Sequence, residues 1–136
     1  MQKQFTCFLI DDDKDEYDIF SIALKQLPRQ VSCVYASDCR EALEKIDSDP
    51  SFIPDFIFID INMPRLNGVQ CLEEVKKIER LKDVPIYMYS TSASDSIVQQ
   101  CKELGATDYI VKPISITDIQ QTILSILSQL ETINPS

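Results

Sequence analysis

Strand-like and helix-like patterns alternate from one end of the chain to the other, and this alternation restricts the fold more than any other feature of the sequence. Short apolar runs predict strands at residues 5–10, 31–35, 56–59, 85–89 and 108–111. Helical spacing of apolar residues predicts helices at residues 15–27, 38–46, 69–80, 95–104 and 115–130. Five strand–helix units in succession predict an α/β fold, with a parallel sheet that helices cover on both faces.

The run at residues 56–59 consists only of Phe and Ile, as expected of a central parallel strand that is buried on both faces. Asp60 closes this strand at its carboxyl end. Ligands of open α/β sheets bind at the carboxyl ends of the strands. Asp60 is therefore the first candidate for a functional residue.

Three other predicted strands also lead into polar side chains. The first leads into Asp11, Asp12 and Asp13, the fourth into Ser90, and the fifth into Lys112. Each of these residues alone has an ordinary interpretation as a helix cap, a turn residue or a solvated lysine. Together with the acid that closes the third strand, they form a set of acids, a hydroxyl and an amine. This set suits a magnesium ion and a phosphoryl group.

The three consecutive acids permit two interpretations. Adjacent carboxylates repel one another unless a cation is present, and magnesium uses one or two carboxylates together with water. Alternatively, the acids cap the following helix and interact with its dipole. Asp13 in particular either strengthens cation binding or caps that helix. A calcium-binding EF-hand is excluded, because Glu16 and Ile22 stand where such a loop needs Gly and Glu.

Composition excludes several classes of function. A net charge of −9, from 13 basic and 22 acidic residues, argues against direct binding of nucleic acid. Apolar runs of about five residues are too short to cross a membrane, and no signal-peptide pattern occurs. The cysteines, which we expect to be reduced, favour a cytoplasmic protein. The absence of histidine excludes nucleophiles activated by histidine. The absence of a glycine-rich phosphate loop disfavours nucleotide binding.

The cysteines indicate neither a disulfide framework nor a zinc site. Their number is odd and no Cys-x-x-Cys pair occurs. Several lie within apolar patterns, so we expect reduced thiols in the core. The five positions are 7, 33, 39, 71 and 101.

Four motifs together resemble those of response-regulator receiver domains, the CheY-like family. They lie at residues 9–12, 60–64, 90–92 and 105–113. The resemblance extends over residues 5–130. It implies one receiver domain at 1–136 without an output domain, folded as a flavodoxin-like three-layer (βα)5 sandwich. The central parallel sheet of five strands would have the order 2-1-3-4-5.

The resemblance also implies roles for individual residues. Asp60 matches the phosphoacceptor and also a ligand of Mg²⁺. Asp12 matches the direct magnesium ligand, Asp11 the acid that holds the metal through water, and the backbone carbonyl of Asn62 a further ligand. No other cofactor is implied.

Ser90 and Lys112 match the hydroxyl and the amine that bind the phosphoryl oxygens, and Tyr109 together with Ser90 matches the conformational switch. Lys112–Pro113 is a candidate for a cis peptide bond. Thr91 stands where a smaller residue is usual, which leads to the hypothesis that it slows phosphotransfer to the acceptor.

The implied function is a phosphorylation-dependent signalling switch, whose only catalysis is its own phosphorylation and dephosphorylation. The expected partners are a sensor histidine kinase or a histidine phosphotransfer protein, and a downstream protein that contacts residues 95–130. A homodimer is compatible with this role. Two alternatives remain: a pseudo-receiver that is never phosphorylated, and, with less support, a haloacid-dehalogenase-type phosphatase that uses Asp11 as its nucleophile.

Overall fold

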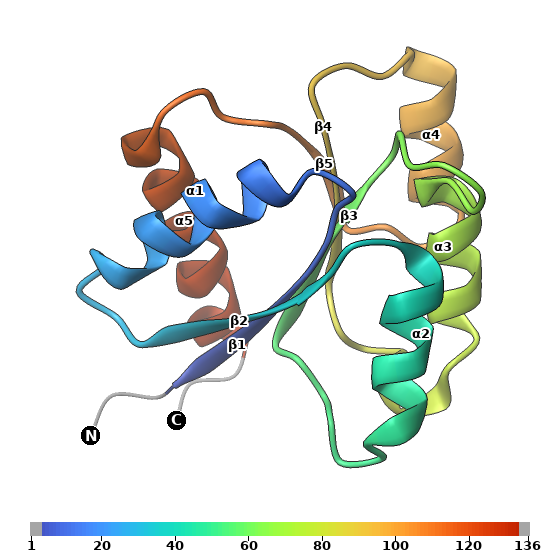
Figure 1. Cartoon of the computed structure of the whole chain (residues 1–136), viewed down its shortest axis with the longest axis horizontal. Helices are drawn as coiled ribbons and strands as arrows, with labels where there is room; N and C mark the ends of the chain where they lie inside the picture. The colour runs from blue at the N-terminus through green and yellow to red at the C-terminus, as the bar shows by residue number, and fades with distance from the viewer. Residues whose placement is uncertain (1–3, 134–136) are drawn as a thin grey trace.

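The computed structural model describes residues 4–133 and has the predicted α/β architecture (Figure 1). The strands are β1 (Phe5–Ile10), β2 (Val31–Ala36), β3 (Phe56–Asp60), β4 (Ile86–Ser90) and β5 (Asp108–Val111). The helices are α1 (Lys14–Lys25), α2 (Cys39–Ser48), α3 (Gly68–Lys76), α4 (Asp95–Glu103) and α5 (Ile116–Ile133), with a 3-10 turn at Glu79–Leu81. All neighbouring strands pair in parallel, in the order β2-β1-β3-β4-β5. The predicted flavodoxin-like order is confirmed.

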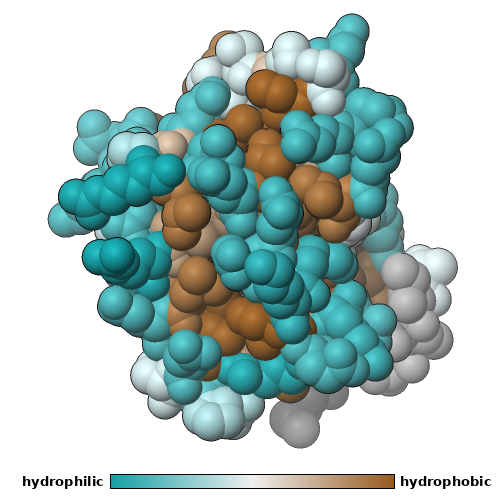
Figure 2. All heavy atoms as spheres, turned by 90° about the vertical axis from the view of Figure 1, so that its right-hand side faces the viewer, coloured by the Kyte–Doolittle hydropathy of each residue, from teal (hydrophilic) through white to brown (hydrophobic). Residues whose placement is uncertain are grey.

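The helices form two layers, one on each side of the sheet. In Figure 1, α1 and α5 lie on one side, and α2, α3 and α4 lie on the other. On the α2–α4 side, apolar areas at the surface are interrupted by hydrophilic side chains (Figure 2). Each layer covers its own hydrophobic cluster, so the sheet is buried on both faces as the sequence predicts.

Strand β3 lies at the centre of the sheet, and all five of its residues are buried. Successive side chains of a strand point to opposite faces. Ile57 and Ile59 therefore pack beneath α2–α4, and Phe56 and Phe58 pack beneath α1 and α5. Burial of each such side chain contributes about 1.5–3 kcal/mol. This packing fixes the strand that carries Asp60 from both sides.

Several element boundaries differ by a few residues from the sequence prediction, and three of them concern the candidate site or the helix beside it. Asp60 and Ser90 are the last residues of their strands, rather than the first residues after them. The helix predicted at 69–80 ends at Lys76, because the backbone there changes to 3-10 geometry, in which hydrogen bonds join residues three apart. Lys77 N–H donates to the carbonyl of Glu74, and the turn Glu79–Leu81 follows.

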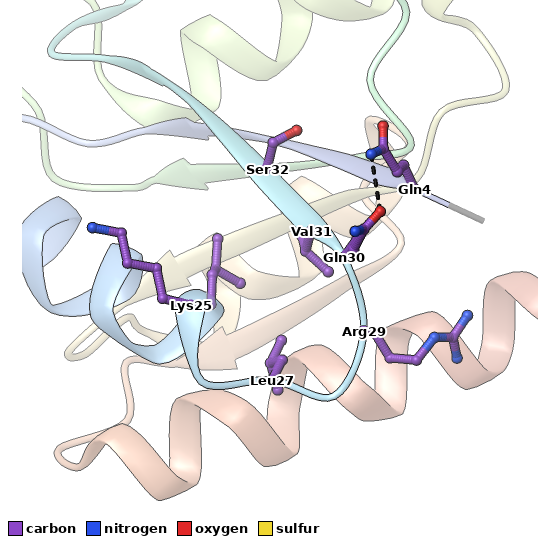
Figure 3. Close-up of a pocket in the computed structure, with 8 residues that line it drawn as sticks. Gln4, Lys25, Leu27, Arg29, Gln30, Val31 and Ser32 are labelled. Atoms are coloured by element: carbon purple, nitrogen blue, oxygen red, sulfur yellow. Dashed lines mark hydrogen bonds between the residues drawn. The ribbon is translucent and has the colours of Figure 1, made fainter. Parts of the chain in front are cut away.

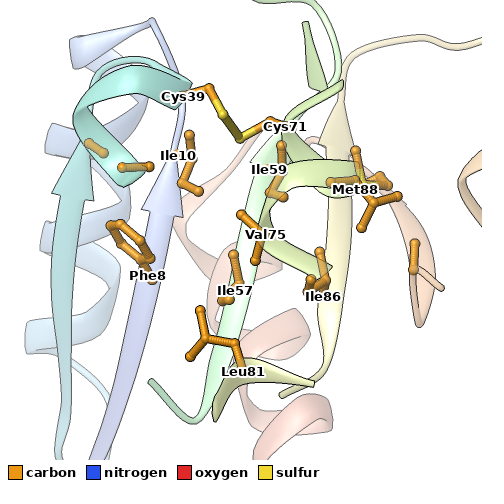
Figure 4. Packing of buried hydrophobic residues seen from close by; sticks show 14 of the residues in the cluster. Phe8, Ile10, Cys39, Ile57, Ile59, Cys71, Val75, Leu81, Ile86 and Met88 are labelled. Carbon is orange, nitrogen blue, oxygen red and sulfur yellow. A yellow bond between two sulfur atoms is a disulfide. The ribbon is translucent and has the colours of Figure 1, made fainter. Parts of the chain in front are cut away.

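The expectation of reduced cysteines was wrong for one pair, because Cys39 and Cys71 form a disulfide (Figure 4). Cys7, Cys33 and Cys101 are free thiols. The paired residues lie 32 positions apart, and only the packing of α2 beside α3 brings their Cα atoms to 5.7 Å. No local cysteine motif records this proximity.

Two further observations restrict where function can lie. Between residues 4 and 133, no helix is long and apolar enough to cross a membrane. A hollow of about 330 Å³ lies near the amino-terminal ends of β1 and β2, where Gln4 bonds to Gln30 (Figure 3). It lies at the opposite end of the strands from Asp60, so it is separate from the candidate site.

Gly68→Ala should lower the free energy of unfolding by about 1–3 kcal/mol. A Cβ atom at this position would lie 2.3 Å from the carbonyl oxygen of Asp60 and 2.5 Å from Cα of Ile61, and neither is a flexible side chain. Urea unfolding of the variant measures the loss. Glu73→Ala, at an exposed position of the same helix, is the matched control and should change stability little. Equal unfolding midpoints for Gly68→Ala and the parent would contradict this close approach.

Candidate functional site

The carboxyl ends of four strands bring the predicted site residues together. Asp11 follows β1, Asp60 closes β3, Ser90 closes β4, and Lys112 follows β5. Asp11, Asp60 and Ser90 are buried, although they are polar. Buried polar groups are costly unless they have partners, so their contacts indicate what the site can do.

Lys112 lies between two of the acids. Its ammonium nitrogen is 2.8 Å from Oδ2 of Asp11 and 3.6 Å from Oδ2 of Asp60. Burial alone would lower the pKa of Lys112, but the adjacent carboxylates outweigh it and the pKa is raised. Lys112 therefore stays charged and supplies positive charge to the site.

One lysine does not balance the acids around it. Burial, followed by the charge of Asp11, raises the pKa of Asp60 from 3.8 to about 7. Lys112 and the backbone N–H of Asn62, which donates to Oδ1 of Asp60 at 3.1 Å, oppose this rise. The ionised form of Asp60 therefore needs more positive charge than the protein provides.

A divalent cation fits this imbalance. Asp11, Asp12 and Asp60 each place a carboxylate oxygen so that the three oxygens lie within 4.8 Å of one another. Oδ2 of Asp11 is buried, and its close partner among the described residues is the ammonium group of Lys112 at 2.8 Å. Hard cations such as Mg²⁺ take oxygen ligands of this kind.

Asp13 lies outside the cluster and caps a helix. Its side chain accepts a hydrogen bond from the N–H of Asp15 at 3.0 Å, at the N-cap of α1. Its own N–H donates to Oδ1 of Asp11 at 2.9 Å. Of the two interpretations that the sequence leaves open, the structure therefore supports the capping role.

Ser90 contacts the loop that follows Asp60. The side-chain nitrogen of Asn62 donates to Oγ of Ser90 at 3.1 Å, and this hydroxyl donates to the carbonyl of Ser92 at 3.0 Å. The contact of the Asn62 side chain with Ser90 was not predicted from the sequence. The position of Asn62, two residues after Asp60, was the only available signal.

Tyr109 contacts Ser90 through the backbone. Its half-buried side chain donates from the hydroxyl to the carbonyl of Ser90 at 3.4 Å, a long bond. The predicted cis bond at Lys112–Pro113 was wrong, since no cis peptide occurs among the described residues.

Sequence reasoning also missed Tyr89 and Glu16, because neither belongs to a motif. The Tyr89 hydroxyl donates to Oε1 of Glu16 at 3.0 Å, and the Lys112 nitrogen lies 5.6 Å from the centre of the Tyr89 ring. A cation at this distance over an aromatic face is attracted to it. Burial raises the pKa of Glu16. Strand alternation places Tyr89 on the α1–α5 side, where its ring stacks on Phe58.

The sequence profile of the response regulator receiver domain matches residues 7–124. The chain belongs to this family. The two-component response regulator ORR8 of Oryza sativa subsp. indica is 32% identical over 111 residues, covering 82% of this chain and 88% of the relative. ORR5 of Oryza sativa subsp. japonica is 29% identical over 112 residues, covering 82% and 81%.

Solved structures agree with this assignment. The chemotaxis response regulator CheY4 of Vibrio cholerae is 30% identical, with a TM-score of 0.76 over 94% of this chain and 99% of that chain. The Mn²⁺-bound form of response regulator Rcp1 is 25% identical, with a TM-score of 0.78 over 94% and 96%. Receiver domains are signalling modules of two-component systems rather than true enzymes, and they bind divalent metal at an acidic pocket.

In metal-free buffer, Asp60→Asn should raise the free energy of unfolding by about 1–3 kcal/mol near pH 8. Asp60 has a pKa of about 7 in the folded chain, against 3.8 as its ordinary value. The folded state therefore retains a proton that the unfolded state releases, and the parent loses stability as the pH rises through that interval. The asparagine has no such penalty, so its advantage should shrink as the pH falls toward 3.8.

Urea unfolding at several pH values measures this difference. Asp18→Asn, which changes an exposed acid on α1, is the control and should show a small effect at every pH. A gain for Asp60→Asn that does not vary with pH would contradict the proposed cause.

Proposed function

We propose that this chain is a phosphorylation-dependent switch in which Asp60 accepts the phosphoryl group. The observation that carries the proposal is the position of Asp60 itself, a buried carboxylate that shares one lysine with Asp11 and lies beside Asp12. The chain would act as a single receiver domain over residues 1–136, in the cytoplasm.

The residues of the chain supply most of the chemistry. The carboxylate of Asp60 attacks phosphorus in line, and the bond to the donor breaks, leaving an acyl phosphate. Lys112 would pair with the phosphoryl oxygens, and the Ser90 hydroxyl would donate to one of them. Bound Mg²⁺ would neutralise charge on the phosphoryl oxygens. Its ligands would be Asp11, Asp12, Asp60 and the backbone carbonyl of Asn62.

Phosphorylation would then change the hydrogen bonds of Ser90. In the present structure its hydroxyl is engaged by Asn62 and by the carbonyl of Ser92. A phosphoryl group on Asp60 is a stronger, charged acceptor, so the hydroxyl would move toward it. The segment after β4 would follow, and Tyr109, which contacts the backbone of Ser90, would change its position.

The α4–β5–α5 surface is the expected output, as a population shift between two arrangements. Val111 and Ile114 support this assignment, because they expose 61% and 99% of their surface although both are apolar. The proposed partners are a histidine kinase or a phosphotransfer protein upstream and a protein target downstream, with a homodimer as a further arrangement. The net charge of −9 disfavours nucleic acid.

The geometry is less favourable to the phosphatase alternative. Asp11, its nucleophile, is fully buried and paired with Lys112. The pseudo-receiver alternative has the same fold and differs only in whether Asp60 is ever phosphorylated.

Intact-mass analysis after incubation with Mg²⁺ and acetyl phosphate should show one phosphoryl adduct. Asp60→Asn should abolish it, as should EDTA. Asp13→Asn is the matched control, because Asp13 caps α1 and lies outside the cluster, and this variant should still be labelled. Labelling at Asp11 would support the phosphatase alternative. No labelling by acetyl phosphate or by histidine kinases would support the pseudo-receiver.

Amide hydrogen exchange should locate the output surface. On phosphorylation, exchange should change several-fold in α4 and β5, because the segment after Ser90 moves. Strand β2 (Val31–Ala36), at the opposite edge of the sheet, is the internal control and should not change. A change confined to β2 and α2 would place the output elsewhere.

A further inference from the structure

The Cys39–Cys71 disulfide joins the starts of two helices on the α2–α4 side (Figure 4). Cys39 is the first residue of α2, directly after its N-cap Asp38. Cys71 closes the first turn of α3, where its N–H donates to the carbonyl of Asn67 at 2.9 Å. The positive end of a helix dipole stabilises a thiolate. Both sulfurs are thus placed where the charge of a departing thiolate is stabilised.

A small surface hollow borders one of the two cysteines. Both side chains are buried, but Cys39 lines a small hollow of about 70 Å³. Arg40, Pro64 and Arg65 form its exposed walls. Asp38 also lines the hollow, but the two guanidinium groups outnumber its carboxylate and favour the approach of a small anionic thiol, such as the tripeptide glutathione.

The loop over this hollow is strained. Arg65 has a φ of +67°, in the left-handed region that residues other than glycine rarely adopt. Such a conformation costs about 1–3 kcal/mol and persists only where the surroundings enforce it. Cys39 lines the same hollow as Arg65, so opening the disulfide changes the surroundings of this loop.

We propose that Cys39–Cys71 is a thiol–disulfide exchange site for small thiols of the glutathione class, and that its redox state sets the conformation of the loop between β3 and α3. Cys39, beside the hollow, is the sulfur that the incoming thiol attacks.

The exchange balances with two thiols. One thiolate attacks Sγ of Cys39, and the protein S–S bond breaks with its electron pair on Cys71, which takes up a proton. A second thiolate attacks the sulfur of the bound thiol and releases Cys39, which is also protonated. Two small thiols are thereby oxidised to one disulfide, while the protein disulfide gains two electrons and two protons. The oxidised form of the same thiol reverses the reaction.

The loop connects this chemistry to Asp60, a step that rests on the proposed function. Asn62, at the start of the loop, donates from its backbone to Asp60 and from its side chain to Ser90, each at 3.1 Å. After reduction, no bond holds the sulfurs of Cys39 and Cys71 together, and their side chains can rotate apart. The starts of α2 and α3 are then no longer cross-linked, and we expect the loop that ends at α3 to move more freely.

Thiol counting in a series of glutathione buffers tests the exchange site. The folded chain is equilibrated, quenched in acid, unfolded, labelled with a maleimide and weighed intact. Because three of the five cysteines are free, the parent should carry three labels in oxidised buffer and five in reduced buffer. Cys39→Ser should carry four labels throughout. Cys71→Ser should carry four labels in reduced buffer and three labels with one bound glutathione in oxidised buffer, because Cys39 then has no partner cysteine to displace the bound thiol. Cys101→Ser, which removes a buried free thiol, is the matched control and should change from two labels to four.

Two results would overturn the exchange site. Five labels on the parent in every buffer would show that the disulfide does not form. Three labels on the parent in every buffer would show that the disulfide is a permanent structural bond, if the number rises to five only when a denaturant is added with the thiol.

Separate measurements test the link to the loop. Reduction should speed hydrogen exchange at residues 61–68 several-fold, a readout that does not need phosphorylation. It should also change the rate of phosphoryl loading by acetyl phosphate several-fold in the parent and in Cys101→Ser. Unchanged exchange at 61–68, or equal loading in the two redox states, would overturn the link. If neither redox state is labelled, the proposed function fails, while the thiol counts still decide the exchange site.

Discussion

The burial of two carboxylates beside a single ammonium group is the constraint on which the rest of this structure depends. Asp11 and Asp60 are almost inaccessible to water, and Lys112 lies within ion-pair distance of both. One positive charge cannot balance two buried negative charges with Asp12 beside them. The pKa of Asp60 is raised first by its burial and then by the charge of Asp11. The deficit of positive charge favours a divalent cation, because additional positive charge would restore the ionised form that attacks a phosphoryl group.

Packing beneath the site holds its residues in place, whereas the polar contacts above it can be exchanged. Strand β3 is buried on both faces, and Gly68 lets α3 start directly against the carbonyl of Asp60. Close-packed groups of this kind resist displacement. The contacts above the sheet are few and easily exchanged, such as those of Ser90 with Asn62 and the long bond from Tyr109. A rigid base under adaptable loops is the arrangement that a two-state switch requires.

Each side of the sheet also supports the site through a feature that lies outside the motifs of the family. On the α1–α5 side, Tyr89 connects Glu16 to the neighbourhood of Lys112. On the α2–α4 side, the disulfide lies beneath the loop that leaves Asp60. The motifs of the family specify neither the contact of Tyr89 with Glu16 nor the disulfide.

The sequence by itself determined the α/β class, the order of the elements, the central strand and the polar residues at the strand ends. These features follow from local periodicity and from the rule that parallel strands share one carboxyl edge. Only the tertiary structure decided that Asp13 caps a helix, that the side chain of Asn62 reaches Ser90, and that Cys39 pairs with Cys71. The contact of Asn62 with Ser90 and the pairing of Cys39 with Cys71 depend on distances between segments about thirty residues apart. The capping role of Asp13 depends on the direction in which one short side chain points. Residue pattern does not encode such distances, because many packings of the same elements share one periodicity.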